Sequence, residues 1–230
     1  MNKPKISVAI PTHEMAQADK FLFESLMKLE QQKFTDFEVV VSDNSDNNKL
    51  KETCDLFSTL NINYFKNPIK GMAPNSNSAI KACKGELIKL LYLDDFLMSP
   101  DSLGEIVLNF HDDFEWLVTG CKHTTDGMDR NNPHLARYRR DIITGHNTIG
   151  SPSVVTIRNN DPLLFDENLT WLLDCDLYKR YYDKYGLPKI LDTFNVVIRQ
   201  GDHQMTNILS DEIKQNEHIY LYKKYANEEK

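Results

Sequence analysis

The sequence predicts an α/β fold in which helices flank a mostly parallel central sheet. Over the first hundred residues, short apolar runs alternate with segments whose apolar residues recur at helical spacing. Each run ends in a cluster of turn-forming polar residues. Strands that alternate with helices in this way form parallel sheets, because a crossover helix is needed to return the chain to the starting edge.

The first half of the chain contains four expected strands with helices between them. The strands cover residues 6–10, 37–41, 62–65 and 87–93, and the helices cover residues 21–29, 50–57 and 74–82. The last strand carries Lys89 inside an otherwise apolar run. We interpret the apolar residues of these segments as the core on both faces of the sheet.

The second half is less regular. Helices are expected at residues 103–110, 172–185 and 206–225, and strands at 116–119, 154–158 and 190–198. A polar segment at residues 122–148 is dense in His, Asn, Asp, Gly and Arg, and such long segments are usually functional or mobile. Its arginines are either a solvated face or a lid over an anionic ligand; they are Arg130, Arg137, Arg139 and Arg140.

Composition narrows the class of protein. The 230 residues suit one domain of ordinary to large size, and 40% apolar with 27% charged residues is typical of a globular protein. The net charge of -7 argues against a protein that neutralises many nucleic-acid phosphates. Neither a membrane-spanning run nor a signal-peptide pattern occurs, so we expect a cytoplasmic protein. The four cysteines form no Cys-x-x-Cys pair, which indicates reduced thiols rather than a zinc ribbon.

The adjacent carboxylates Asp94 and Asp95, at the end of the fourth expected strand, are the clearest candidate site. Ligands of open α/β sheets bind at the carboxyl ends of the strands. Two adjacent carboxylates repel each other unless a cation or a donor-rich ligand compensates them. The alternative is an Asp that caps the next helix, but Ser99 or Asp101 is better placed for that. We therefore interpret the pair as a metal and phosphate site.

Other polar residues are expected at the same edge of the sheet. Thr12 and His13 follow the first strand, and Asp43 follows the second, where it should lie at the surface. An Asp in this place typically accepts hydrogen bonds from a nucleoside, although the Asp-Asn-Ser-Asp sequence also favours a simple turn. No glycine-rich phosphate loop occurs, so a bound diphosphate would need a divalent cation, with Asp95 as its first ligand.

Two further residues are candidates in the second half. Asp174 lies early in an expected helix, where the helix dipole favours an acid; if that end faces an acceptor pocket, Asp174 is placed as a base. Asp176 is expected to pair with Arg180 on the helix surface. His203 lies between the last strand and the last helix, either as a solvated loop histidine or as a metal or phosphate contact.

Taken together, these segments resemble the family 2 glycosyltransferases, which are inverting enzymes with the GT-A fold. The likeness lies in residues 6–13, 39–45, 77–86, 93–95, 150–153 with 165–180, and 203–206, in the order of that family. Three positions depart from its pattern. Ser76 replaces a frequent Arg, Phe96 leaves the shorter two-Asp form of the metal site, and Leu173 leaves Asp174 as the only candidate of its acidic pair.

The resemblance implies one GT-A domain over residues 1–230, Rossmann-like with a smaller acceptor-side sheet. Residues 1–100 would bind a nucleotide sugar and residues 101–230 the acceptor. The implied reaction transfers a sugar from a nucleoside diphosphate, most often UDP, to a hydroxyl of a glycan or similar acceptor with inversion, as in polysaccharide biosynthesis.

The resemblance also assigns the site residues. Asp174 would be the general base, and Asp95 and His203 would hold Mn²⁺ or Mg²⁺. The nucleotide sugar would contact Pro11, Thr12, His13, Asp43, Asn77 and Asp94. Two other classes remain open: a nucleotidyltransferase, which would normally carry a glycine-rich basic loop near the first strand, and a non-catalytic module that binds a nucleotide sugar or a glycan.

Overall fold

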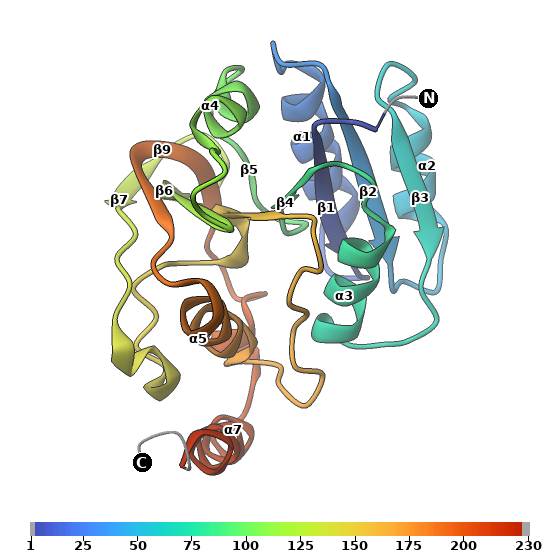
Figure 1. Cartoon of the computed structure of the whole chain (residues 1–230). Coiled ribbons are helices and arrows are strands. Elements are labelled where there is room, and N and C mark those ends of the chain that lie inside the picture. The colour runs from blue at the N-terminus through green and yellow to red at the C-terminus, as the bar shows by residue number, and fades with distance from the viewer. Residues whose placement is uncertain (1–2, 227–230) are drawn as a thin grey trace.

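The computed structural model describes residues 3–226, whose nine strands join in one continuous sheet with helices on both faces (Figure 1). The strand order is β3-β2-β1-β4-β8-β6-β9-β5, and β7 pairs with β6 outside this path. The predicted α/β architecture is therefore confirmed.

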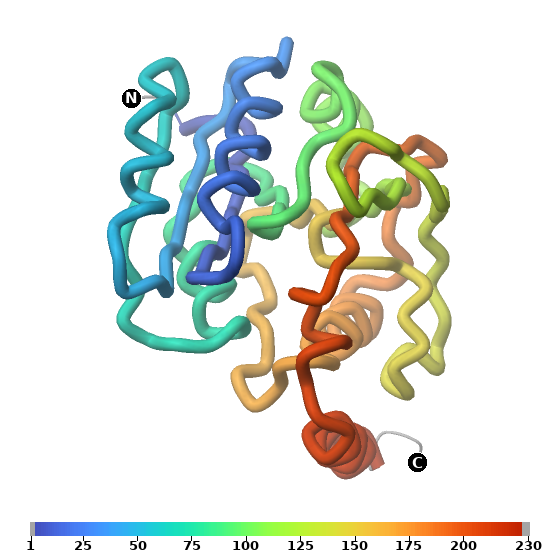
Figure 2. Tube along the Cα trace, turned by 180° about the vertical axis from the view of Figure 1, so that it is seen from behind, coloured from blue at the N-terminus to red at the C-terminus, as the bar shows by residue number. Residues whose placement is uncertain are grey.

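The first half forms the parallel part of the sheet. Its strands are β1 (Ile6–Thr12), β2 (Phe37–Asp43), β3 (Ile62–Lys66) and β4 (Leu87–Leu90), and β1 lies between β2 and β4. Helices α1 (Ala18–Glu30) and α2 (Lys49–Asp55) cover one face, and α3 (Met72–Ala82) covers the other (Figures 1 and 2). Every residue of β1 is buried, as expected for a parallel strand that is covered on both faces.

The second half extends this sheet instead of forming a separate one. Its elements are β5 (Phe96–Leu97), α4 (Ser102–Asn109), β6 (Trp116–Thr124), β7 (Asn131–His134), η1 (Arg140–Thr144), η2 (Pro152–Val154), β8 (Val155–Arg158), α5 (Leu173–Tyr185), β9 (Lys189–Arg199), α6 (Met205–Ile208) and α7 (Asp211–Tyr225). Strand β8 pairs antiparallel with both β4 and β6, and β9 then runs parallel to β6. The predicted smaller acceptor-side sheet is thus continuous with the parallel part through β8.

Among the elements whose bounds differ from the prediction, three bear on the site. Strand β4 ends at Leu90, because the chain turns before the acidic pair and the Asp95 N–H donates to the Tyr92 carbonyl (2.9 Å). The polar segment 122–148 is not one loop, since it contains β7 and η1. The closing helix is divided into α6 and α7 because Ser210 caps the start of α7, accepting from the Ile213 N–H.

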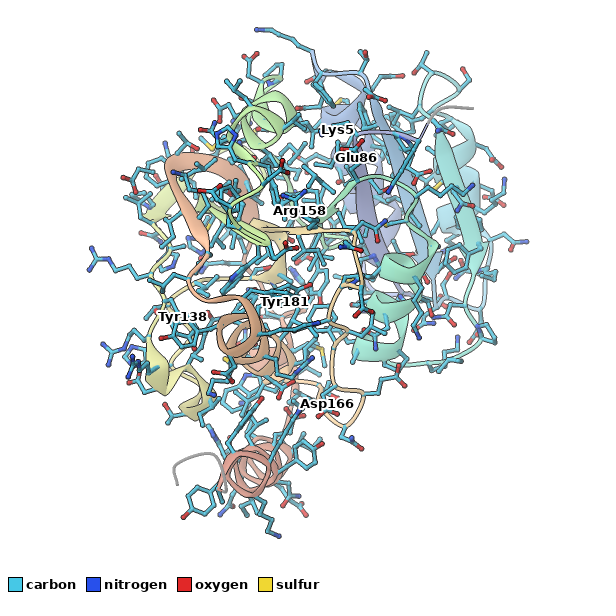
Figure 3. All side chains as sticks on the ribbon, viewed as in Figure 1. Lys5, Glu86, Tyr138, Arg158, Asp166 and Tyr181 are labelled. Carbon is cyan, nitrogen blue, oxygen red and sulfur yellow. The ribbon has the colours of Figure 1, made fainter. Side chains whose placement is uncertain are left out.

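A close backbone approach sets the register of β1, β2 and β4. Gly85 lies so near β1 that a Cβ there would be 2.5 Å from the Ser7 nitrogen. Its N–H donates to Ser7 Oγ (2.7 Å), which in turn donates to Glu38 Oε1 (2.6 Å). The neighbouring Lys5–Glu86 ion pair lies at the same end of the sheet (Figure 3). These contacts join the starts of three strands, so their carboxyl ends meet at one edge.

Helix α7 fastens the start of α5 to the rest of the second half. The buried Glu217 carboxylate accepts from the backbone N–H groups of residues 170–172, at 2.8, 2.9 and 2.8 Å. Lys224 Nζ donates to both Asp166 and Asp176 at 2.6 Å, and Figure 3 shows Asp166 facing α7. The predicted pairing of Asp176 with Arg180 is confirmed (2.8 Å). The predicted surface location is wrong, because α7 covers Asp176 completely.

Two expectations from composition can be compared with the fold. The four cysteines are free and buried, as expected for reduced thiols in a core. Among the helices of residues 3–226, none is both long enough and apolar enough to cross a bilayer.

Replacing Glu217 with alanine should destabilise the protein. The substitution leaves one buried and two partly buried backbone N–H groups without their acceptor, at a cost of about 1–3 kcal/mol. For a chain of this size, each kcal/mol lowers the Tm by about 2–4 °C. Thermal unfolding of Glu217→Ala and of the control Glu212→Ala, an exposed acid on the same helix, measures the difference. Equal Tm values in the two variants would contradict the anchoring role.

Candidate active site

A cavity of about 860 Å³ lies where the carboxyl ends of the parallel strands face the start of α5. Its walls come from the ends of β1 and β2, the turn after β4, the turn before η2, and segments 170–175 and 198–206. The last two segments touch, because Trp171 Nε1 donates to Thr206 Oγ1 (3.2 Å). Figure 2 shows the chain between β9 and α7 running down the near side of the molecule. The volume suits a small-molecule ligand.

Six of the nine predicted site residues line this cavity: Pro11, His13, Asp94, Asp95, Asp174 and His203. The other three, Thr12, Asp43 and Asn77, are buried and lie outside its lining. The structure therefore brings together the acidic pair, His203 and the candidate base Asp174, which are far apart in the sequence.

The two carboxylates of the acidic pair have different surroundings. Asp94 is partly exposed, and its Oδ2 lies 3.0 Å from Nε2 of His203. Asp95 is buried and accepts from the Arg199 backbone N–H (3.0 Å) and from the Ser151 hydroxyl (3.2 Å). Burial raises the pKa of Asp95, and the adjacent Asp94 charge acts in the same direction. A cation beside the pair would favour its ionised form.

These side chains fit a divalent cation whose coordination is completed by its substrate. Within residues 3–226, no three His, Cys, Asp or Glu side chains cluster closely enough to hold a metal ion by themselves. Two carboxylates and an imidazole at the cavity wall offer part of a coordination shell. Mg²⁺ is often bound by one or two carboxylates together with substrate phosphates and water. Because of the imidazole, the set also suits Mn²⁺.

Arg199 is a residue of the site that the sequence reading missed. It ends β9, is 5% exposed and lines the cavity beside the acidic pair. Its guanidinium pairs with Glu24 of α1, lies 4.5 Å from the Phe21 ring centroid and donates to the Asp94 carbonyl (3.3 Å). Arg199 therefore holds the turn of the acidic pair against β9 and α1. The feature of the sequence that could have indicated Arg199 is its position directly after the strand expected at residues 190–198.

Asp174 lies in the first turn of α5 and also lines the cavity. Its Oδ2 accepts from Asn147 Nδ2 and its Oδ1 from the Cys175 N–H, both at 2.7 Å. Burial raises the pKa of Asp174 to about 6, although these hydrogen bonds favour the charged form. A carboxyl with a pKa close to neutral pH is well suited to accept a proton.

Asn147, which orients Asp174, was also missed by the sequence reading. Its Oδ1 accepts from the N–H groups of Ile149 and Gly150, each at 3.0 Å, so its side chain is fixed by its own turn. Gly145 and Asn147 are the parts of the polar segment 122–148 that line the cavity. The four arginines of that segment do not line it, and their role as a lid stays a prediction.

Asp43 is fully buried, which corrects the expectation that it lies at the surface. Strand β3 places Tyr64 and Lys66 over it, and they donate to its Oδ2 at 2.6 and 2.8 Å. The N–H and hydroxyl of Ser45 also donate to the carboxylate, both at 2.8 Å. Burial would raise the pKa of Asp43, but the hydrogen bonds from Lys66, Tyr64 and Ser45 lower it. The protein itself thus satisfies this carboxylate.

Asn77 uses its amide for internal contacts. Its Nδ2 donates to the Phe165 carbonyl (3.0 Å) and to Glu167 Oε1 (2.9 Å), and its Oδ1 accepts from the Phe165 N–H (2.8 Å). It therefore joins α3 to the segment that leads into α5. Its predicted contact with the nucleotide sugar stays a prediction.

Five polar residues that line the cavity near the ends of β1 and β2 were not predicted. Asn44, Ser45, Asp46, Lys70 and Asn75 surround the ends of β1 and β2. Asn75 Nδ2 donates to the Thr12 carbonyl (2.8 Å), and Lys70 pairs with Asp46 (2.6 Å). These side chains, and not the buried Asp43, are therefore the polar groups at this end of the cavity.

A sequence profile of glycosyl transferase family 2 matches residues 7–181. This span contains the acidic pair and Asp174, and it covers more than half of the chain. The chain belongs to glycosyl transferase family 2. The resemblance in the sequence motifs is thereby confirmed.

Relatives of this family 2 chain include three known proteins. Chondroitin synthase from Escherichia coli is 25% identical over 228 residues, with 89% of this chain and 31% of that protein covered. The structure of S. aureus TarS 1-349 in complex with UDP-GlcNAc matches with a TM-score of 0.72 at 21% identity, covering 90% of this chain and 61% of that one. Mannosyltransferase PcManGT from Pyrobaculum calidifontis, in complex with GDP-Man and Mn²⁺, matches with a TM-score of 0.63 at 14% identity, covering 88% and 59%.

These structural similarities confirm the GT-A type of fold. The family 2 chain spans less than two thirds of the length of each of these three relatives.

Replacing Asp43 with alanine should destabilise the fold. The change removes the acceptor of the partly buried Tyr64 hydroxyl and of the buried Ser45 N–H, and it removes one partner of Lys66, at a cost of about 1–3 kcal/mol. Glu52→Ala, an exposed acid on α2 outside the cavity lining, is the control and should change the Tm and nucleotide binding little. Thermal unfolding and nucleotide binding on the same preparations check this. Unchanged stability with weaker binding in Asp43→Ala would instead support a direct ligand contact.

Proposed function

We propose that this protein is an inverting glycosyltransferase that moves a sugar from a nucleoside-diphosphate sugar, UDP-linked, to a hydroxyl of a glycan or similar acceptor. The observation that carries the proposal is that one cavity is lined by Asp94, Asp95 and His203 and also by Asp174. This arrangement offers a place for a metal-bound diphosphate opposite a base.

The donor would bind at the carboxyl ends of β1, β2 and β4. Asn44 and Asp46 would contact its nucleoside, and Asp94, Asp95 and His203 would hold Mn²⁺ or Mg²⁺. When bound, the cation would act as a Lewis acid and stabilise the charge of the departing diphosphate. The similar structures in complex with UDP-GlcNAc, and with GDP-Man and Mn²⁺, support a nucleotide-sugar donor and a metal.

Asp174 would take the proton from the acceptor hydroxyl as that oxygen attacks the anomeric carbon. A single displacement of this kind inverts the anomeric centre and needs one base on the acceptor side, without a covalent intermediate. Asn147 keeps the carboxylate oriented through its 2.7 Å hydrogen bond. The pKa of about 6 leaves Asp174 largely ionised at neutral pH and therefore able to accept the proton.

Asp174→Asn tests the enzyme assignment. The amide keeps the size of the side chain but cannot accept the proton, so turnover should fall by roughly 10²–10⁴-fold. Donor binding should hardly change, because the proposed donor contacts lie on the other wall. Release of nucleoside diphosphate, nucleotide affinity and Tm on one preparation separate loss of the base from misfolding. Full turnover in Asp174→Asn would exclude the mechanism.

The pH dependence of turnover should report the same carboxylate. Asp174 acts only when ionised, so kcat should fall as the pH drops through about 6 and should reach its plateau only above neutral pH. Asn147→Ala removes a hydrogen bond that favours the charged form, so the acidic limb should move to higher pH. Turnover measured between roughly pH 5 and 8 shows both effects. A limb that stays in place in Asn147→Ala would contradict the assignment.

Metal dependence tests the donor wall. UDP should bind more tightly with Mn²⁺ than with chelator, and Asp95→Asn and His203→Ala should each lose most of that difference, because a metal ligand is removed. Asp94→Asn tests whether Asp94, which contacts His203, also binds the cation. If it does, this variant should also lose part of the difference in UDP affinity. Calorimetry measures the affinities, with Asp46→Asn as a control that lines the cavity away from the pair. Unchanged metal dependence in Asp95→Asn and His203→Ala would remove both from the metal site.

A further inference from the structure

Trp171 is a large aromatic residue of the cavity that the proposed mechanism does not use. It lines the cavity together with Asp174 and precedes it by three positions in the chain. Its surface is partly exposed, whereas Trp116, the second tryptophan of the chain, is fully buried in the core. Aromatic side chains contribute most to packing and binding when their apolar surface is covered. Trp171 therefore keeps ring surface that a ligand can cover.

Contacts from α6 and α7 hold the Trp171 side chain in one position. Its Nε1 donates to Thr206 Oγ1 (3.2 Å), and its backbone N–H donates to Glu217 Oε2 (2.9 Å). The His218 ring lies nearly perpendicular to the indole, with the ring centroids 5.3 Å apart. Lys214 Nζ lies over the indole, 5.7 Å from its centroid. A ring that is already fixed loses little conformational entropy when a ligand packs against it.

The location of this ring matches the acceptor side of the cavity. Three residues of chain span at most about 11 Å, so a molecule that touches the indole lies within reach of the Asp174 carboxylate. Gly145 lines the cavity next to His218, where a Cβ would be 3.2 Å from His218 Cε1, and it has no side chain to fill the space. Among residues 3–226, the other Phe, Tyr or Trp of the lining is Tyr92, which belongs to the turn of the acidic pair.

A sugar ring has the surface that an indole face can bind. The face of an aromatic ring carries partial negative charge. A pyranose presents C–H groups on its ring faces, while its hydroxyls project from the rim. Contacts between weakly positive C–H groups and an aromatic face are attractive, and they leave the hydroxyls free for hydrogen bonds or reaction.

We propose that Trp171 is a specificity-determining residue that packs against the apolar face of a sugar ring in the acceptor. The ring would place one hydroxyl of that sugar beside Asp174. The acceptor class is therefore a saccharide, instead of a hydroxyl on a peptide or a lipid. This inference rests on the proposed function, because it needs Asp174 to act on an acceptor.

The kinetics of three variants test the role of Trp171. UDP-hexoses serve as donors, and methyl pyranosides and disaccharides of the gluco, galacto and manno series serve as acceptors. In Trp171→Ala the acceptor KM should rise by roughly tenfold, while Trp171→Phe, which keeps an aromatic face, should recover most of the loss. The affinity for UDP should be unchanged in both. Tyr222→Ala, an exposed aromatic residue of α7 outside the cavity lining, is the control and should have the parent's KM.

Tryptophan fluorescence provides a readout that does not depend on turnover. Because Trp116 is fully buried, a change in emission when a saccharide is added to the UDP-bound protein should come from Trp171. The change should occur in the parent protein and be absent in Trp171→Phe. Glycerol, which has hydroxyls but no sugar ring, should not produce it. A ring that only stabilises the fold would give no response to saccharides.

The outcomes separate this inference from the proposed function. If Trp171→Ala does not fold, Trp171→Leu, which keeps apolar bulk without a ring, takes its place. Sugar transfer with an unchanged acceptor KM in the Ala or Leu variant would overturn the role of Trp171 alone. An emission that no saccharide changes would overturn it as well. Absence of UDP binding in the parent protein would instead exclude the proposed function and this inference together.

Discussion

The register of β1 with its two parallel neighbours is the constraint on which the site depends. Ser7 on β1 joins Gly85 and Glu38, so the chain enters β1, β2 and β4 at matched levels. Because the three strands start at the same level, their carboxyl ends also lie at one edge of the sheet, where Thr12 is the register partner of Asp43. A side chain at Gly85 would collide with the Ser7 backbone and separate these strands. The donor wall of the cavity is therefore a consequence of packing at the far end of the sheet.

The opposite wall depends on contacts from distant parts of the second half. The first turn of α5 carries Asp174, but no strand end fixes where that turn lies. Glu217 holds the preceding backbone from α7, and Asn147 holds the carboxylate from the polar segment. Strand β8 pairs with both β4 and β6 and so joins the two halves into one sheet.

The carboxylates around the cavity divide into two groups by their partners. Asp43 and Asp176 are fully buried beside lysine or arginine, so the protein neutralises them and they stabilise the fold. Asp94 and Asp174 line the cavity, where a histidine and an amide are their side-chain partners. Asp95 is intermediate, because it lines the cavity yet is buried against hydroxyl and backbone donors. This division separates acids that serve structure from acids that remain available to a ligand.

The sequence by itself determined the order of most strands and helices, the family and six of the residues that line the cavity. Apolar periodicity is a local property, and a polar residue after a buried strand must lie at a sheet edge; Asp94, Asp95 and His13 could therefore be placed. Only the tertiary structure decided that Tyr64 and Lys66 cover Asp43 and that Asn147 orients Asp174. It also decided that Arg199 holds the turn of the acidic pair. Those contacts join residues from separate elements, and whether an edge residue is buried depends on which neighbours cross it, which no local pattern encodes.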